Sequence, residues 1–366
     1  MTKMPINILI LGASYGLLPG VKLALAGNRV TFVGREAEIA EVAKSVVEVC
    51  IPQRRSSGQI ILRVPIESDA SPGAAALRTP DQIEPAAYDF IILAMQEPQF
   101  KAPQVAELLV RVAASRRPCL SIMNLPPPPF LRRLGGVPSS AFAGVYHSPA
   151  IWDGFDPSRM SLASPDPQAV RLDPARPGRL TVTLPSNFKA APFEDPQDQA
   201  LLERVASDLT RLKVRHQGKD VRPPVSLLAH RSLLIPLAKW PMLIAGNCRC
   251  LGPYGLRSIA EAVLSDSATS RTIYAQVSEL ALAIGTAPQD LVDYSSYAKA
   301  AEMLGRPSSM ARALGVGATE VERVDLLVLN LMRTYGMDTA IVEPIVATID
   351  RAIAHNVGLR SGNLDL

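Results

Sequence analysis

Short apolar runs alternate with helical patterns along the first part of the chain. Residues 6–11 are apolar except for Asn7, which is typical of a central strand buried on both faces of a sheet. The turn GASYG at 12–16 follows, and the next residues have helical spacing up to Gly27. Residues 29–33, RVTFV, predict a second strand. Strand, turn, helix and strand within about 30 residues make one βαβ unit.

The same alternation continues through the first third of the chain. Further strands are predicted at 60–64, 89–94 and 118–123, and a helix at 103–115. Strands that alternate with helices favour a parallel, doubly wound sheet. The proline run LPPPPFL at 125–131 predicts an extended loop, because proline fits neither a helix interior nor a central strand.

The pattern then changes in two stages. Strands are predicted at 142–147 and 179–184, with a surface loop rich in proline and aspartate at 153–177. After residue 224 the pattern becomes almost entirely helical. Helices are predicted at 225–250, 256–285, 289–304, 319–335 and 339–356.

Strands followed by helices predict an α/β chain of two domains. We expect an N-terminal doubly wound Rossmann domain, residues 1–220. An all-helical C-terminal domain, residues 221–366, would serve substrate binding and dimerisation. Residues 324–332, VDLLVLNLM, are apolar around most of a helix, which indicates either a deep core position or a subunit contact. The second possibility makes a homodimer the expected assembly.

Composition excludes several classes of protein. The 366 residues are 48% hydrophobic and 20% charged, which indicates a folded globular protein. The net charge of +4 comes from 38 basic and 34 acidic residues that are interspersed, so no nucleic-acid partner is expected. No apolar run reaches the ~20 residues of a membrane span, and the N-terminus lacks a signal-peptide layout. We expect a cytoplasmic protein with a small-molecule substrate.

The cysteines favour neither a metal site nor a disulfide framework. Cys248 and Cys250 form C-x-C without a partner pair, so zinc is not expected. Four cysteines are also too few to form a disulfide framework in a chain of this length. Small buried apolar side chains are the simpler interpretation.

The turn at 12–16 fits two chemistries. Gly12-Ala13-Ser14-Tyr15-Gly16 matches G-x-S-x-G, the nucleophile elbow of α/β-hydrolases. Here it follows the first strand, with no upstream loop for an oxyanion donor and no histidine with an obvious partner acid. In a dinucleotide-binding turn the same residues surround the pyrophosphate at a helix N-terminus: Gly12 allows the tight turn, and Gly16 allows close helix packing. We favour this second interpretation; a purely structural turn is the alternative.

The residues that follow the second strand indicate whether NAD or NADP is bound. NAD sites usually carry an acidic residue there, whereas this chain has Gly34-Arg35-Glu36. Arg35 can pair with a 2′-phosphate, so NADP (NADPH) is favoured. NAD stays an alternative because of Glu36, and Arg35 could also be an ordinary solvated side chain.

Several segments are similar to a known family. They include LALAGNRVTFVGRE near the N-terminus, then DFIILAMQ, then the strand that ends at Asn124. The most specific segments are PSSM at 307–310, ATEVE at 318–322 and YGM at 335–337. Together they resemble the ketopantoate reductase family over most of the chain, with residues 125–220 the poorest part.

The resemblance implies NADPH-dependent reduction of a 2-oxo acid that is held between two domains. It implies that Ser309 binds polar groups of the substrate and that Asn124 lies near the nicotinamide. Glu320 would bind a substrate hydroxyl or the cofactor near the reacting centre. Gln96 stands where the family has a lysine, and we assign it to the cofactor site. A helix N-cap for Ser309 and a first-turn acid for Glu320 are the alternatives.

The catalytic lysine of that family is missing from its place. The family's helix reads roughly W-x-K-L-x-x-N, and this chain has Met242 at the lysine position. Lys239, three residues earlier on nearly the same helical face, is our first candidate for the proton donor. Asn247, one residue late for the family's asparagine, is expected to bind substrate. Because Met242 and Gln96 replace two cations, we do not expect ketopantoate itself to be the substrate.

His147 is the second candidate for the proton donor. It lies in a loop, residues 144–149, where the family has a loop beside the cofactor, and histidine can act as an acid near neutral pH. The expected function is an NADPH-dependent reductase of a 2-oxo acid or a related carbonyl or imine. Opine-type dehydrogenases, which share the layout and use a histidine, are one alternative. A catalytically inactive NADP-binding protein is the other.

Overall fold

The computed structural model describes residues 4–42, 46–53, 58–173, 175–252 and 255–362. Its Cα positions divide into two compact units. Unit 1 consists of Met1–Met95, Gln99–Arg133 and Ala150–Leu233, and unit 2 consists of Gln96–Pro98, Leu134–Pro149 and Leu234–Leu366. Unit 2 therefore takes two short segments from the first half of the chain in addition to the C-terminal region.

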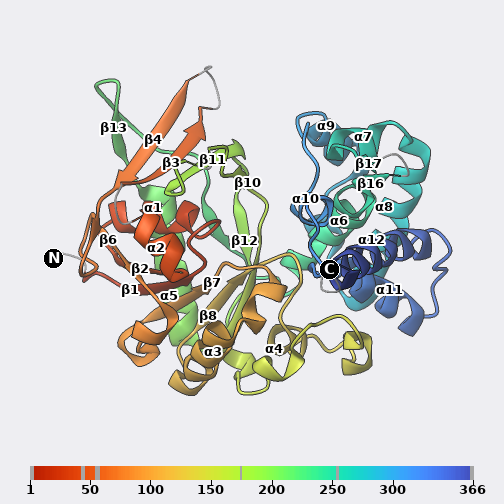
Figure 1. Ribbon diagram of the computed structural model, residues 1–366, viewed down its shortest axis with the longest axis horizontal. Coiled ribbons are helices and arrows are strands. Elements are labelled where there is room, and N and C mark those ends of the chain that lie inside the picture. Colours follow the sequence, from red (N-terminus) through yellow and green to blue (C-terminus); the bar gives the residue numbers. More distant parts are fainter. Residues whose placement is uncertain (1–3, 43–45, 54–57, 174, 253–254, 363–366) are drawn as a thin grey trace. The chain divides into compact units, whose positions relative to one another are not determined.

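Unit 1 is built on a 9-stranded sheet with the order β15-β12-β9-β8-β7-β1-β2-β6-β5. Figure 1 labels several of its strands, among them β1, β2 and β7. From β5 to β9 every neighbouring pair is parallel. β12 runs antiparallel to β9 and parallel to β15. The strands are β1 (Asn7–Leu11), β2 (Arg29–Val33), β5 (Ile66–Glu67), β6 (Ala75–Arg78), β7 (Phe90–Leu93), β8 (Cys119–Ile122), β9 (Met160–Ser164), β12 (Phe188–Ala190) and β15 (Leu227–Ala229).

The central order β6-β2-β1-β7-β8-β9 is the doubly wound order, which confirms the predicted fold class. The chain moves outward in one direction from β1 to β2 and in the other from β7 to β8. The carboxyl ends of β1 and β7 therefore flank the point at which open α/β sheets bind their ligands. Helices α2 (Glu36–Val42), α3 (Pro103–Ser115) and α5 (Pro196–Arg211) belong to the same unit.

A second sheet explains why the first helix is buried on all sides. α1 (Leu17–Leu25) contacts β2 of the large sheet and also β3 and β4 of a 4-stranded sheet. Enclosed in this way, every residue of 17–24 is buried. The order of the 4-stranded sheet is β10 (Gln168–Val170), β11 (Arg179–Leu184), β3 (Val47–Pro52) and β4 (Gln59–Val64).

Most of the strands predicted in the first 220 residues are confirmed, but two segments are not as expected. The predicted surface loop at 153–177 contains β9, which is buried along its whole length, and β10. Because β9 contains small residues, its sequence did not show the apolar pattern of a strand. The strand is nevertheless buried, because it has neighbouring strands on both sides. The strand predicted at 142–147 is instead a 3-10 helix, Ser139–Phe142, followed by turns, because Gly144 takes a φ of 70°.

Two predictions about proline-containing segments were also wrong in part. Residues 225–250 are not one helix: they form β15 and then the short helices η7 (Ile235–Lys239), α6 (Trp240–Ala245) and η8 (Asn247–Arg249). Pro236 and Pro241 each sit at the start of a new helical segment, where proline is tolerated. For the same reason LPPPPFL ends in a single helical turn, α4 (Pro128–Leu131), rather than in an extended loop.

Unit 2 is helical apart from a short strand pair, β16 (Leu251–Gly252) and β17 (Gly255–Leu256). α11 (Val324–Thr334) contacts α6, α8 (Ser267–Ile284) and α12 (Glu343–Gly362), and most of its apolar residues are buried. The apolar run at 324–332 is therefore explained by a core position. The other α-helices are α7 (Ile259–Leu264), α9 (Tyr294–Ala301) and α10 (Ser309–Gly315).

Candidate functional site

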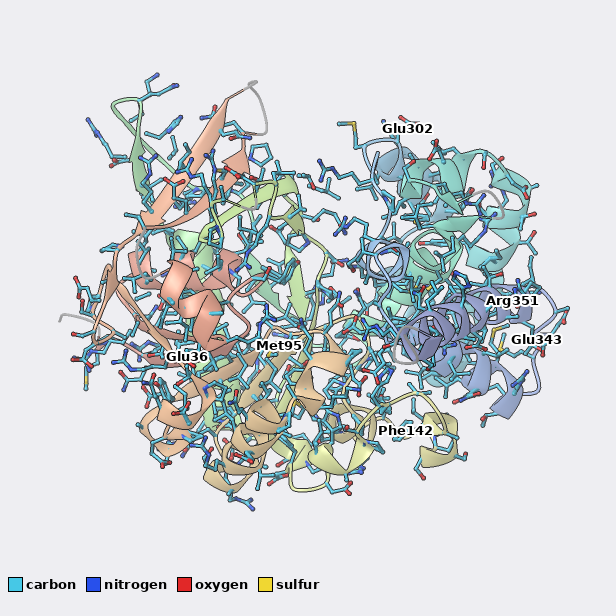
Figure 2. All side chains as sticks on the ribbon, viewed as in Figure 1. Glu36, Met95, Phe142, Glu302, Glu343 and Arg351 are labelled. Carbon is cyan, nitrogen blue, oxygen red and sulfur yellow. The ribbon has the colours of Figure 1, made fainter. Side chains whose placement is uncertain are left out.

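The turn after β1, residues 12–16, is tight for a steric reason. Gly12 has a φ of 113°, and a Cβ added to it would lie 2.5 Å from the carbonyl oxygen of Ala94 and 2.9 Å from Cγ of Met95. A Cβ on Gly16 would lie 2.4 Å from the carbonyl oxygen of Gly12. Only glycine fits at both positions, so the turn packs directly on the segment that follows β7, where Met95 is labelled in Figure 2.

The same turn presents backbone donors at the start of α1. Gly16 precedes the helix without a side-chain cap, and Ser14 is exposed. The carbonyls of Ser14 and Tyr15 accept from Leu17 and Leu18. Across the part of the chain that the structure describes, the amides of residues 13–16 donate to no protein acceptor. Unpaired amides at a helix N-terminus are suited to a phosphate group.

The side chain of Tyr15 anchors the turn. Its hydroxyl donates to the carbonyl of Pro167 at 2.7 Å, and its ring packs edge-on against Phe188, with the centroids 6.0 Å apart. Burial, with a smaller effect of Asp166, raises the pKa of Tyr15 well above its usual value. Arg171 donates to the carbonyl of Ala13. The segment on both sides of β10 therefore holds the turn, and Tyr15 has only its amide to offer a ligand.

Other predicted cofactor residues come just after the carboxyl ends of β2, β7 and β8. Arg35 comes two residues after β2 and is exposed; Asn124 comes two residues after β8. Oδ1 of Asn124 is buried and has no hydrogen-bond partner among the described residues. Because buried acceptors in native proteins are nearly always paired, this atom suits a donor from a bound ligand. Gln96, half-buried, comes three residues after β7.

In unit 2 the structure pairs His147 with a carboxylate that we did not predict. Nδ1 of His147 lies 2.6 Å from Oε2 of Glu97, and the backbone N–H of His147 donates to Oε1 of Glu97 at 3.0 Å. The Glu97 side chain is 1% exposed and the His147 side chain 19%. Glu97 lies in MQEPQ, where the sequence suggests an ordinary loop residue. The only sequence signal was its position just beyond the end of β7.

The region around Asn247 and Ser309 differs from expectation by one residue. Ser308, not Ser309, is the N-cap of α10: its Oγ accepts from the N–H of Ala311 at 3.2 Å and donates to the carbonyl of Asn247 at 2.8 Å. Ser309 is exposed in the first turn. Its predicted contact with substrate stays a prediction, as does that of Asn247.

Lys239 and Glu320 are half-buried positions in unit 2. Lys239 ends η7 and precedes α6, one turn before Met242. Glu320 lies between α10 and α11. Both residues already take part in interactions within the protein. The roles predicted for them stay predictions.

The described residues contain no hydrogen bond between Ser14 and a histidine, as a hydrolase would need. Among them there is also no group of three His, Cys, Asp or Glu side chains arranged to hold a metal ion. None of the described helices combines the length and apolar character required to cross a membrane.

Neither a protein-family model nor a curated protein matches the sequence. The structure, in contrast, is similar to solved structures. Ketopantoate reductase from Ralstonia eutropha JMP134 is 14% identical, with a TM-score of 0.62 over 95% of this chain and 99% of that one. D-mandelate dehydrogenase with NADH and anilino(oxo)acetate is 15% identical, with a TM-score of 0.61 and the same coverage. A dimeric ketopantoate reductase from Staphylococcus aureus is 11% identical, again with a TM-score of 0.61, 95% and 99%.

Across almost its whole length this chain therefore has the fold of ketopantoate reductases and D-mandelate dehydrogenase. The resemblance noted in the sequence is confirmed at the level of the fold.

Proposed function

We propose that this protein is an NADPH-dependent reductase of a 2-oxo acid or a related carbonyl or imine. The observation that carries the proposal is the turn at residues 12–16, whose amides are unpaired at the switch point of a doubly wound sheet. The fold shared with ketopantoate reductases and a D-mandelate dehydrogenase supports it. Both neighbours are named for enzymes that interconvert 2-oxo and 2-hydroxy acids.

The residues of unit 1 fit a nicotinamide dinucleotide. The amides of residues 13–16 would hold the pyrophosphate, and Arg35, which is exposed after β2, would pair with the 2′-phosphate of NADP. The orphan Oδ1 of Asn124 would accept from the nicotinamide half. When bound, the reduced nicotinamide supplies a hydride. NAD is the alternative cofactor.

The chain itself must then supply a proton and bind the substrate. Reduction of a carbonyl leaves an oxygen that needs a proton, and a side chain near neutral pKa transfers it best. His147 and Lys239 are the two candidates. Asn247, Ser309 and Glu320 are the candidates for binding polar groups of the substrate. Because Met242 and Gln96 stand where the family has cations, we propose a substrate other than ketopantoate.

Two measurements test this function. Titration calorimetry with NADPH should give binding that the same protein with Gly12→Val lacks. NADPH oxidation, followed by absorbance, should then be screened against a panel of 2-oxo acids with and without added amino acids. Oxidation that requires an amino acid would favour an opine-type dehydrogenase. NADPH binding without reduction of any panel member would favour an inactive NADP-binding protein, and no binding at all would overturn the proposal.

A dimer is the assembly that we propose in solution. The Staphylococcus aureus ketopantoate reductase is described as dimeric. Light scattering after size exclusion should therefore give twice the mass of one chain.

A further inference from the structure

The contact between Glu97 and His147 has the geometry of a carboxylate that orients a proton-donating histidine. We propose that Glu97 is a positioning residue that fixes the His147 ring, so that Nε2 of His147 delivers the proton to the substrate oxygen. The inference rests on the proposed reductase function, and it names the donor in preference to Lys239.

The two carboxylate oxygens of Glu97 have different partners on the same residue. Oε1 accepts from the backbone N–H of His147, a group that can only donate. Oε2 faces Nδ1 at 2.6 Å, the length of a strong hydrogen bond to a charged acceptor. An ionised carboxylate cannot donate, so Nδ1 must carry a proton in either ring state. The proton that comes and goes is therefore on Nε2.

The burial of Glu97 supports a specific role. A carboxylate that is 1% exposed is costly unless its lone pairs are satisfied, and His147 satisfies both oxygens. The backbone N–H of Glu97 lies 3.4 Å from Oε1 of Glu322, just before α11, which fixes the position of the loop. Phe142 (labelled in Figure 2) packs edge-on against Tyr146, the residue that precedes His147.

Chain connectivity ties this pair to the end of β7. Glu97 follows Met95 by two residues, and consecutive Cα atoms are 3.8 Å apart, so their Cα atoms are separated by at most about 7.6 Å. Met95 in turn packs against Gly12. A positioning carboxylate is therefore attached directly to the segment that supports the predicted cofactor turn.

The step that we assign to His147 balances as follows. When bound, the reduced nicotinamide would supply the hydride that forms a C–H bond at the carbonyl carbon, and the π electrons of the carbonyl would move to its oxygen. That oxygen takes the proton of Nε2: an O–H bond forms, the Nε2–H bond breaks, and the imidazolium becomes a neutral imidazole that keeps its Nδ1–H. The nicotinamide is oxidised, the carbonyl is reduced, and water later returns a proton to Nε2.

The substitution Glu97→Gln separates this role from a structural one. The glutamine oxygen must still accept from the His147 backbone N–H, so its NH₂ group faces Nδ1. Nδ1 must then become an acceptor, which moves the proton to Nε2 and disfavours the imidazolium. We expect kcat to fall about 100-fold or more, with KM and the Kd for NADPH within about twofold of the original values. Glu302→Gln, the same change at an exposed glutamate, is the matched control.

Nitrogen-15 NMR of histidine-labelled protein gives a readout that does not depend on activity. The neutral ring of His147, assigned by its loss in His147→Asn, should be protonated on Nδ1 in the original protein and on Nε2 in Glu97→Gln. The asparagine of His147→Asn can keep a donor near the Nδ1 position but has no proton to transfer. Its kcat should fall as far as that of Glu97→Gln, and the double variant should fall no further than the lower single variant.

Two results would overturn the inference. One is an Nε2-protonated neutral ring in the original protein. The other is a kcat in His147→Asn equal to that of the original protein, which would leave Lys239 as the donor. A protein that reduces no substrate would instead reject the reductase function, and with it the step given to Nε2, while the NMR experiment would still report whether Glu97 orients the ring.

Discussion

Lys22 and Val225 are joined by a hydrogen bond from the lysine Nζ to the valine carbonyl, although Lys22 is 0% exposed. The same nitrogen donates to the carbonyls of Pro223 and Pro224, at 3.2 and 3.0 Å. Val225 has a φ of 72°, a left-handed conformation that β-branched residues rarely adopt. A side chain of α1 therefore holds a strained turn just before β15, and its three N–H donors match three carbonyls.

This buried lysine makes stability depend on pH. Burial lowers the pKa of Lys22 to about 7, whereas in the unfolded chain it is about 10.4. Between these values the unfolded state binds more protons, so the free energy of unfolding should rise with pH, by about 2 kcal/mol from pH 7 to pH 9. The three carbonyl acceptors favour the ammonium and reduce this gain. Urea unfolding at several pH values measures it.

Lys22→Met should remove that pH dependence and lower stability. The methionine fills the space but leaves three carbonyls without their donor, which should cost about 2–4 kcal/mol at pH 7. Lys219→Met, at an exposed position in β14 (Lys219–Val221), should change stability by less than about 0.5 kcal/mol. Equal pH slopes in Lys22→Met and the original protein would show that another group is responsible.

Gly16→Ala should weaken NADPH binding through the shape of the turn. The new Cβ would lie 2.4 Å from the carbonyl oxygen of Gly12 and 2.6 Å from Cγ2 of Ile10, so the turn has to shift. We expect the Kd for NADPH to rise at least about tenfold. Gly135→Ala, where the added Cβ meets nothing within 4 Å, is the control. Unchanged calorimetric binding in Gly16→Ala would contradict a cofactor role for this turn.

Arg35→Ala should change the choice of cofactor. Without the guanidinium the 2′-phosphate loses a charged partner, so the Kd for NADPH should rise about tenfold. The Kd for NADH should stay within about twofold of the original value. Fluorescence titration with both nucleotides measures the ratio. If both affinities fall together, Arg35 does not read the 2′-phosphate.

Ser308→Ala and Ser309→Ala should separate a helix cap from a substrate contact. Ser308 caps α10 and donates to the carbonyl of Asn247, so its loss should lower stability by about 1–2 kcal/mol. Ser309 is exposed, and its replacement should change stability by less than about 0.5 kcal/mol while raising KM. Thermal unfolding and steady-state kinetics measure the two effects. An unaltered KM in Ser309→Ala would remove it from the substrate site.

The amino-acid sequence by itself determined the features that depend on neighbours along the chain. Apolar runs predicted β1, β2, β7 and β8, and the glycines predicted the tight turn between β1 and α1. These signals are local, because a strand buried on both faces of a sheet carries apolar side chains on both, and a φ of 113° at Gly12 favours glycine. Composition and the alternation of strands with helices were enough for the doubly wound fold.

Tertiary structure alone decided which distant residues meet. β9 could not be predicted from the sequence, because its small side chains are buried only when the strand pairs with β8 on one side and β12 on the other. Glu97 and His147 are fifty positions apart, and Lys22 lies about two hundred positions from the carbonyls that it binds; no period or motif links such pairs. Each contact joins a buried polar group to a hydrogen-bond partner, and the two groups lie close together only in the folded chain.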